Sequence, residues 1–235
     1  MEKEKKGTKH YLLLYFVFFS IFGLVMETLF CYITTGVLES RKGLIIGPFC
    51  PIYGVGAVVL IYFLEKVKDN NRKIVILGAI LGTIVEYVLS YILEALYGSR
   101  FWNYEDRFLN LNGRVCLLYA IYWGLLSLLL MKSLKPKIDK LIDKIPLKKE
   151  FLDSLIITFF VFDTILTVWG VCTYQRRIQI QYYNKNIKVD TNSIRYKIEE
   201  KIFPNEYMLK TFPNLRMRDV EGKEIFIKSL INQEI

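Results

Sequence analysis

The stretch 73-KIVILGAILGTIVEYVLSYILEALY-97 decides the fold of this chain. It is an almost uninterrupted apolar run, and it exceeds the roughly 20 residues with which a helix crosses a bilayer. Small and acidic residues recur at every fourth position within it, namely Gly78, Gly82, Glu86, Ser90 and Glu94. Residues four apart lie on neighbouring turns, so they form one stripe. Because two carboxylates inside a membrane are costly unless they face protein or water, the stripe predicts one wall of a polar site.

Four further apolar runs accompany this one. In order, the runs cover residues 11–37, 50–64, 74–97, 115–131 and 151–174. The chain has 235 residues, of which 53% are hydrophobic, and these are gathered in the runs. We therefore predict an all-α polytopic membrane protein with about five transmembrane helices. The second run is short unless it begins near Leu44, and a re-entrant segment at 44–53 is the alternative.

The distribution of positive charge predicts the orientation. The segment before the first run and the connections after the second and fourth runs hold 15 Lys and Arg, whereas the alternate connections hold five. Short cytoplasmic loops carry the excess of Lys and Arg, so we expect a cytoplasmic N-terminus. The abundance of Lys, Ile and Asn favours a bacterial cell membrane as the location. Basic charge placed in this way indicates contact with membrane lipid and not with nucleic acid.

Two domains are expected, a membrane domain at 11–175 and a polar C-terminal tail at 176–235. Five spans would put the tail outside the cell. Arg176 and Arg177, directly after the last run, favour a tail on the inside. A re-entrant segment in place of the second span would leave an even number of spans and would also put the tail inside. The first connection contains Gly36, Gly43 and three further Gly or Pro residues, which favours a bent or re-entrant loop. We identify no internal repeat in the sequence.

The orientation gathers charged residues on one side of the membrane. Glu27 and Glu94 lie in the outer parts of their runs, whereas Glu86 and Asp163 lie near the middle of the third and fifth runs. We predict a substrate-binding site or proton relay formed by Glu27, Glu86, Glu94, Asp163, Arg41, Arg100, Arg114, Asn110 and Asn112. The alternative is structural pairing, of Glu94 with Arg100 or Arg114 and of Asp163 with a Tyr or Ser. Trp102, Tyr104, Trp123 and Trp169 are expected to be interfacial anchors.

The sequence has few residues suited to metal binding, nucleophilic catalysis or ATP hydrolysis. The one histidine, His10, precedes the first run, so a His-based zinc centre or a Ser–His nucleophile is not expected. The P-loop spacing GxxxxGK[ST] is absent from the sequence, so we expect no ATP-hydrolysing module. The four cysteines have neither CxxC nor zinc-site spacing, and we interpret them as small apolar filler. Their expected place at the outer ends of the runs also allows disulfides in an oxidising exterior. We predict no catalytic residue, metal or cofactor.

Several ordered motifs resemble a known family. The segment 47-GPFCPIYGVG-56 supplies Gly47, Pro48, Cys50, Pro51, Tyr53 and Gly54. It is followed by Glu86-Tyr87, Leu93-Glu94, Trp102-x-Tyr104, 110-NLNGRVCL-117 and Trp123-Gly124. Together these resemble the putative ABC-transporter type IV family, the CmpB-like bacterial membrane proteins. The resemblance implies a multispanning protein labelled a permease, and it gives the loop motif a structural role.

Two positions depart from the family pattern. Arg41-Lys42-Gly43 stands where the family has Asn-Arg-Gly, and Asn103 replaces the acid of Trp-Asp-Tyr. Asn103 keeps hydrogen-bonding capacity without charge, so we expect a structural role there.

The leading functional hypothesis is a transport protein, either a permease or a permease subunit that is driven by a separate ATPase or by an ion gradient. One alternative is a non-transporting assembly or sensory partner, whose tail binds another protein. The other is a membrane-embedded enzyme acting on lipid or peptide, with a buried Glu as base and arginines that hold phosphate. Expected partners are membrane lipid, an ATPase or other membrane subunit, and further copies in an oligomer.

Overall fold

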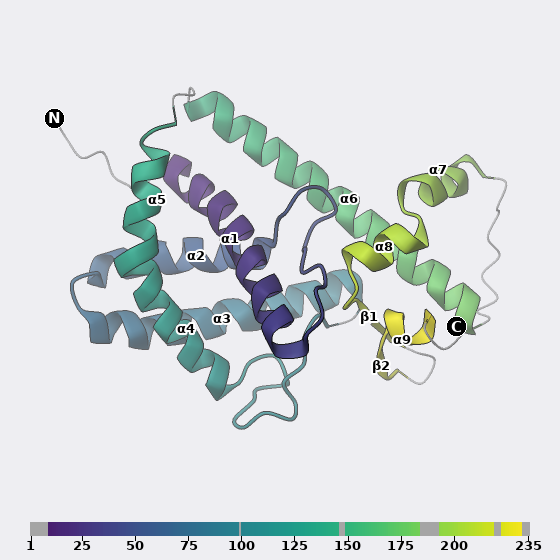
Figure 1. Ribbon diagram of the computed structural model, residues 1–235, viewed down its shortest axis with the longest axis horizontal. Coiled ribbons are helices and arrows are strands. Elements are labelled where there is room, and N and C mark those ends of the chain that lie inside the picture. The colour runs from purple at the N-terminus through teal and green to yellow at the C-terminus, as the bar shows by residue number, and fades with distance from the viewer. Residues whose placement is uncertain (1–8, 99, 146–148, 184–192, 219–221, 232–235) are drawn as a thin grey trace.

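The computed structural model describes residues 9–98, 100–145, 149–183, 193–218 and 222–231. The membrane part contains α1 (Lys9–Thr35), α2 (Pro51–Leu64), α3 (Asn71–Tyr97), α4 (Leu117–Leu129), α5 (Lys135–Ile142) and α6 (Lys149–Tyr183). The tail contains α7 (Ile194–Ile202), α8 (Asn205–Thr211), β1 (Arg216–Arg218), β2 (Glu224–Phe226) and α9 (Ile227–Ile231) (Figure 1). The strands β1 and β2 pair antiparallel.

Four helices are long and apolar enough to cross a membrane. They are Lys9–Thr35, Asn71–Tyr97, Leu117–Ile142 and Glu150–Tyr183, the third being α4 and α5 joined through a π-helical turn. This confirms the predicted class of multispanning helical membrane protein. Five complete spans are not confirmed, because α2 has 14 residues, a length of about 21 Å against a hydrocarbon core of about 30 Å.

Local sequence explains where these helices begin and end. The side chain of Asn70 accepts a hydrogen bond from the Lys73 amide at 3.0 Å and caps the start of α3. The helix ends at Gly98, whose φ of 70° is the left-handed conformation that glycine adopts without strain. Pro51 occupies the first turn of α2, where its missing N–H is not needed.

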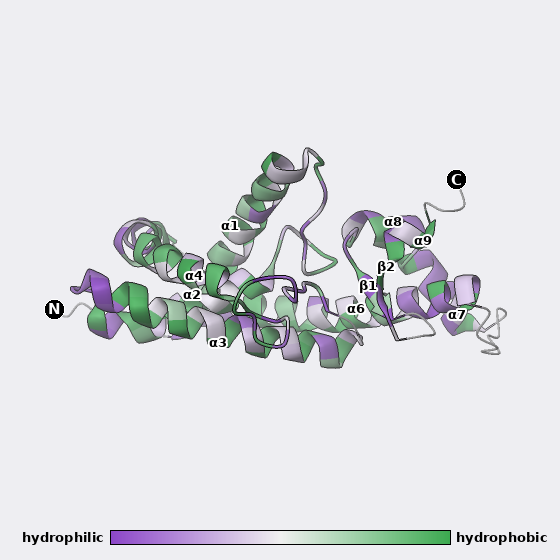
Figure 2. Cartoon of the chain, turned by 90° about the horizontal axis from the view of Figure 1, so that it is seen from below, coloured by the Kyte–Doolittle hydropathy of each residue, from purple (hydrophilic) through white to green (hydrophobic). Residues whose placement is uncertain are grey.

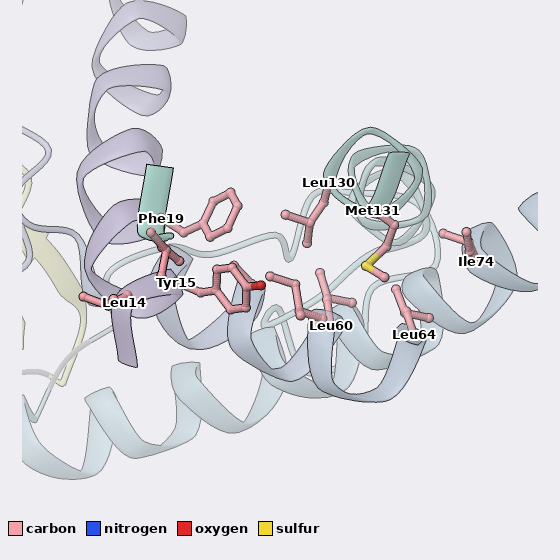
Figure 3. Packing of buried hydrophobic residues seen from close by; sticks show 11 residues of the cluster. Leu14, Tyr15, Phe19, Leu60, Leu64, Ile74, Leu130 and Met131 are labelled. Atoms are coloured by element: carbon pink, nitrogen blue, oxygen red, sulfur yellow. The ribbon is translucent and has the colours of Figure 1, made fainter. Parts of the chain in front are cut away.

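The first hydrophobic core joins α1, α2, α3, α4 and α5 at the end of the molecule where α1 begins. Side chains from these helices interdigitate around Tyr15, Leu64 and Met131 (Figure 3). The Tyr15 hydroxyl donates a hydrogen bond to Asp139, which also accepts one from Lys135 Nζ at 3.1 Å. The second half of α1 rises away from α2 and α3 (Figure 2) and exposes apolar side chains, as lipid contact requires.

The connection 36–50 folds back along α1 instead of staying beyond its end. The Cys50 amide donates to the carbonyl of Ser20 at 2.9 Å, about 22 Å before the end of α1 at Thr35. The amides of Ile45 and Ile46 donate to side chains of α6, Thr167 Oγ1 and Asp163 Oδ1, both at 3.0 Å. These side chains satisfy backbone amides that have no partner in a helix or strand. The contact of Cys50 with Ser20 places the start of α2 about halfway along α1.

The tail packs around a second core with the end of α6. Phe203, Met208 and Met217 are fully buried there, and α6 continues past the expected boundary at residue 175 to Tyr183. Glu199 is 2% exposed and accepts hydrogen bonds from Trp169 Nε1 at 2.9 Å and from Arg195 and Arg176. Burial alone would raise the pKa of Glu199, but these donors and positive charges hold it below its ordinary value.

Ion pairs fix the tail against one end of the membrane part. Lys228 pairs with Glu39 in the connection 36–50, and Arg218 pairs with Glu94 near the end of α3. The tail thus lies at the end that carries the connections 36–50 and 98–116. The start of α1 and the connection from α2 to α3 lie at the other end (Figure 1).

Candidate functional site

Glu86 is the most enclosed carboxylate of the predicted stripe. Its side chain, on α3 and 7% exposed, accepts hydrogen bonds from Trp123 Nε1 at 3.1 Å and from the Tyr104 hydroxyl at 3.0 Å. Gly82, one turn earlier on α3, makes room for the indole, because a Cβ added there would overlap the root of the Trp123 side chain. The small residue Gly82 therefore lets the Trp123 indole approach α3 and donate its hydrogen bond to Glu86.

Tyr104 reaches Glu86 because the connection 98–116 folds back over α3. Its ring stacks on Tyr119 of α4, with centroids 4.5 Å apart and planes at 21°. Burial raises the pKa of the Tyr104 phenol well above its ordinary value, and the neighbouring charge of Glu86 raises it further. The phenol therefore keeps its proton and acts as a hydrogen-bond donor.

Glu94 lies nearer the end of α3, among arginines. It accepts hydrogen bonds from Arg114, Arg218 and Arg100, the last through Nε at 3.2 Å. Arg114 is 8% exposed and also donates to Ser90 Oγ at 3.1 Å. The geometry matches the structural pairing of Glu94 with Arg100 and Arg114 that the sequence offered as an alternative.

A cavity of about 590 Å³ lies beside this cluster. It is lined by Tyr87, Tyr91, Arg100, Glu105, Asn110, Asn112, Gly113 and Arg114. The Arg114 guanidinium lies 5.8 Å from the Tyr87 ring centroid and 5.4 Å from that of Tyr91, within cation–π range.

The two predicted asparagines shape the connection that forms the cavity wall. Asn110 Nδ2 donates to the carbonyls of Glu105 and Arg107, at 2.9 and 3.0 Å. Asn112 Nδ2 donates to the Tyr87 hydroxyl at 2.9 Å, and its backbone has a φ of 53°, which Asn tolerates better than most residues.

Glu27 occupies a comparable place on α1. It accepts a hydrogen bond from the hydroxyl of Tyr53 on α2. The Tyr53 ring lies over Gly23, one turn before Glu27, where an added Cβ would overlap it. The loop motif thus contributes a donor as well as a turn, which uses Gly47 at a φ of 71°.

The structure places Asp163 and Arg41 apart from these carboxylates. Asp163 holds the connection 36–50 through the Ile46 amide and also accepts from Thr167 Oγ1 at 3.4 Å. The Arg41 guanidinium contacts Cys31 Sγ at the end of α1. Of the predicted residues, Glu27 and Glu86 both lie within electrostatic reach of Tyr119 on α4, Glu94 lies in a cluster of arginines, and Asp163 anchors the connection 36–50.

The cysteines and possible metal ligands are also placed. Cys31, Cys50 and Cys116 are buried free thiols, and Cys172 is an exposed free thiol. Within the described ranges, no three His, Cys, Asp or Glu side chains come together as metal ligands.

Sequence reasoning missed the aromatic donors. Tyr104 and Trp123 were expected to be interfacial anchors, and Tyr53 was assigned only a structural role. The available signal was the glycine one turn before each carboxylate, Gly23 before Glu27 and Gly82 before Glu86.

Comparison with known families gives a match. A family model described as Putative ABC-transporter type IV matches residues 14–168. The chain belongs to this family. The matched region of the ABC-transporter type IV family member runs from α1 into α6 and includes Glu27, Glu86, Glu94 and Asp163. Searches of curated proteins and of solved structures gave no match. Family and helices together support a membrane protein with a role in transport.

Proposed function

We propose that this protein is a permease or permease subunit in which Glu27 and Glu86 exchange a cation with water, the proton being the smallest such cation. The supporting observation is the kind of partner that each acidic residue has. Glu94 is compensated by three arginines, and Asp163 holds backbone amides. Glu27 and Glu86 accept hydrogen bonds from the neutral groups of Tyr53, Tyr104 and Trp123.

The energetics favour a cation at these two positions. Within the part of the chain that the structure describes, neither Glu27 nor Glu86 forms an ion pair. A charged side chain at the centre of a transmembrane helix costs about 2.5–3.5 kcal/mol on insertion scales. Neutral donors offset only part of this cost, so a proton or another cation is the natural remaining partner.

The proposed topology has five crossings. In this topology the connection 36–50, which folds back along α1, and the half-length helix α2 together make the second crossing, in the manner of the broken helices of transporters. The tail then lies outside, at the end that carries the connections 36–50 and 98–116, and the Lys-rich connections and the N-terminus lie in the bacterial cytoplasm. An odd number of crossings is consistent with the contacts of the tail to Glu39 and Glu94.

The energy source in this proposal is a separate subunit or an ion gradient. The sequence has no P-loop spacing, so ATP hydrolysis would be supplied by an ATPase partner. The family label supports such an association without naming the partner. The assembly-partner and enzyme alternatives stay predictions.

A pH step tests the proposal without knowledge of the transported solute. Purified protein is adsorbed in proteoliposomes on a solid-supported membrane, and the charge displaced by a rapid change of pH is recorded. Carboxylates that exchange cations with water inside the membrane bind protons and so displace charge. We expect a transient from the wild type that is smaller in Glu27→Gln and in Glu86→Gln.

The control is Glu206→Gln, which removes an exposed carboxylate of the tail and should leave the transient unchanged. A wild-type transient no larger than that of protein-free vesicles would contradict the proposed function.

A further inference from the structure

The hairpins α1–α2 and α3–α4 repeat one set of contacts. In the first, the Tyr53 ring lies over Gly23 and its hydroxyl donates to Glu27. In the second, the Trp123 ring lies over Gly82 and its indole N–H donates to Glu86. In both hairpins the glycine precedes the carboxylate by one helical turn, so the ring fills the gap that the glycine leaves.

The residue that follows each aromatic donor repeats a second contact. It is Gly54 after Tyr53 and Gly124 after Trp123. A Cβ on Gly54 would meet the Phe16 carbonyl and the Ser20 side chain of α1.

The matching contact in the second hairpin falls at the same positions of α3. A Cβ on Gly124 would lie 2.8 Å from the Val75 carbonyl and 3.4 Å from Ala79 Cβ. Val75 precedes Gly82 by seven residues and Ala79 precedes it by three, which are the intervals of Phe16 and Ser20 from Gly23. The two hairpins therefore share their antiparallel register as well as their donors.

The sequence carries only a trace of this correspondence, which is too weak to identify an internal repeat without the structure. The segment 23-GLVMETLFCYITTGVLESR-41 aligns without gaps with 82-GTIVEYVLSYILEALYGSR-100, and six of its residues are identical. Both long helices, α1 and α3, have 27 residues. The second hairpin has a longer connection, 98–116 against 36–50, which obscures the repeat beyond the helices.

We infer that the membrane part contains two copies of one hairpin, and that Tyr53 and Trp123 are equivalent positioning residues for two matching cation-binding carboxylates, Glu27 and Glu86. Both long helices start at the same end of the molecule, so the copies are parallel repeats and not inverted ones. The inference rests on the proposed function only for the bound cation. The equivalence of the hairpins is tested separately.

Each donor has a definite physical task in this arrangement. A neutral O–H or N–H fixes the rotamer of the carboxylate but leaves its charge uncompensated, so the position remains open to a cation. Glu86 receives a second hydrogen bond from Tyr104 of the connection 98–116. Loss of one donor should therefore disturb Glu27 more than Glu86.

Exchange of the two donors tests the equivalence. Tyr53→Trp and Trp123→Tyr keep an aromatic hydrogen-bond donor in place, whereas Tyr53→Phe and Trp123→Phe keep only the ring. The readout is the infrared band of protonated carboxyl groups in the full-length protein in lipid, recorded as the pH is lowered. Glu27→Gln and Glu86→Gln assign the two bands, each by the loss of one.

We expect Tyr53→Phe to shift only the Glu27 band, and Trp123→Phe to shift only the Glu86 band, both to higher frequency. The donor-exchange variants should keep each band near its wild-type position. Bands that do not respond to the Phe variants, or that both respond to either one, would overturn the inference, as would the absence of both bands. Band shifts as expected without displaced charge in the pH-step experiment would leave the hairpin equivalence standing and reject the transport function.

Discussion

The contact between Gly82 and Trp123 gives the sharpest stability prediction. In Gly82→Ala, the added Cβ would overlap Trp123 at Cγ and Cβ, the root of the side chain, which cannot turn aside without movement of α4. Overpacking of this kind costs about 1–3 kcal/mol. If the indole moves, the buried Glu86 also loses a donor that lies 3.1 Å away, which costs about 1–3 kcal/mol more.

The free energy of unfolding should therefore fall by at least about 2 kcal/mol. Each kcal/mol lowers the melting temperature of a chain of this size by about 2–4 °C, so the expected drop is about 4 °C or more. The assay is thermal unfolding followed with a thiol-reactive dye, which reports the exposure of the buried free thiols Cys31, Cys50 and Cys116.

The matched control is Ala95→Val, which adds carbon atoms at an exposed position of the same helix and should leave the melting temperature unchanged. A Gly82→Ala protein that melts with the wild type would refute the packing argument, because the side-chain root would then have room for the added atom.

Three further outcomes follow from other contacts. Arg114→Ala should destabilise the protein by about 1–3 kcal/mol in the same thermal assay, because it removes one of the three arginines that compensate Glu94 and the hydrogen bond to Ser90. Arg114→Lys should not restore stability, because lysine lacks the planar fork of the guanidinium. Thr167→Val should cost about 1–3 kcal/mol, since it removes the acceptor of a buried amide in the connection 36–50. Lys228→Gln should speed proteolysis of the tail through loss of about 0.2–1 kcal/mol. The hydrogen bond from Lys228 lowers the pKa of Glu39 in the folded protein. The ion pair therefore contributes its full stabilisation above the unfolded-state pKa of Glu39 and loses it as the pH falls through the lower folded-state pKa. Proteolysis of the wild-type tail should accelerate over that range of pH.

The long helices could be predicted from sequence because each has its own apolar run. The runs at 11–37 and 74–97 agree closely with α1 and α3. The structure of the second run could not be predicted from its own residues. Pro51 fixes where α2 begins, and side chains of α6, such as Asp163, accept hydrogen bonds from the backbone amides that precede α2. That support comes from more than 100 residues away, so local periodicity contains no sign of it.

The candidate site also combines contacts that the sequence predicts with contacts that depend on the tertiary structure. The pairing of Glu94 with arginines follows from charge and proximity to the helix end, and the sequence offered it as an alternative. The donors Tyr53 and Trp123 depend on the antiparallel register within each hairpin, which composition and spacing do not fix. Tyr104 depends on how far the connection 98–116 folds back over α3.

The most direct test of the central claim is the pH-step charge displacement of the double variant Glu27→Gln/Glu86→Gln beside both single variants. If the two carboxylates exchange cations with water inside the membrane, each single variant keeps part of the wild-type charge and the double variant keeps none above protein-free vesicles. A double variant that unfolds at the wild-type temperature and displaces the wild-type charge would contradict the claim.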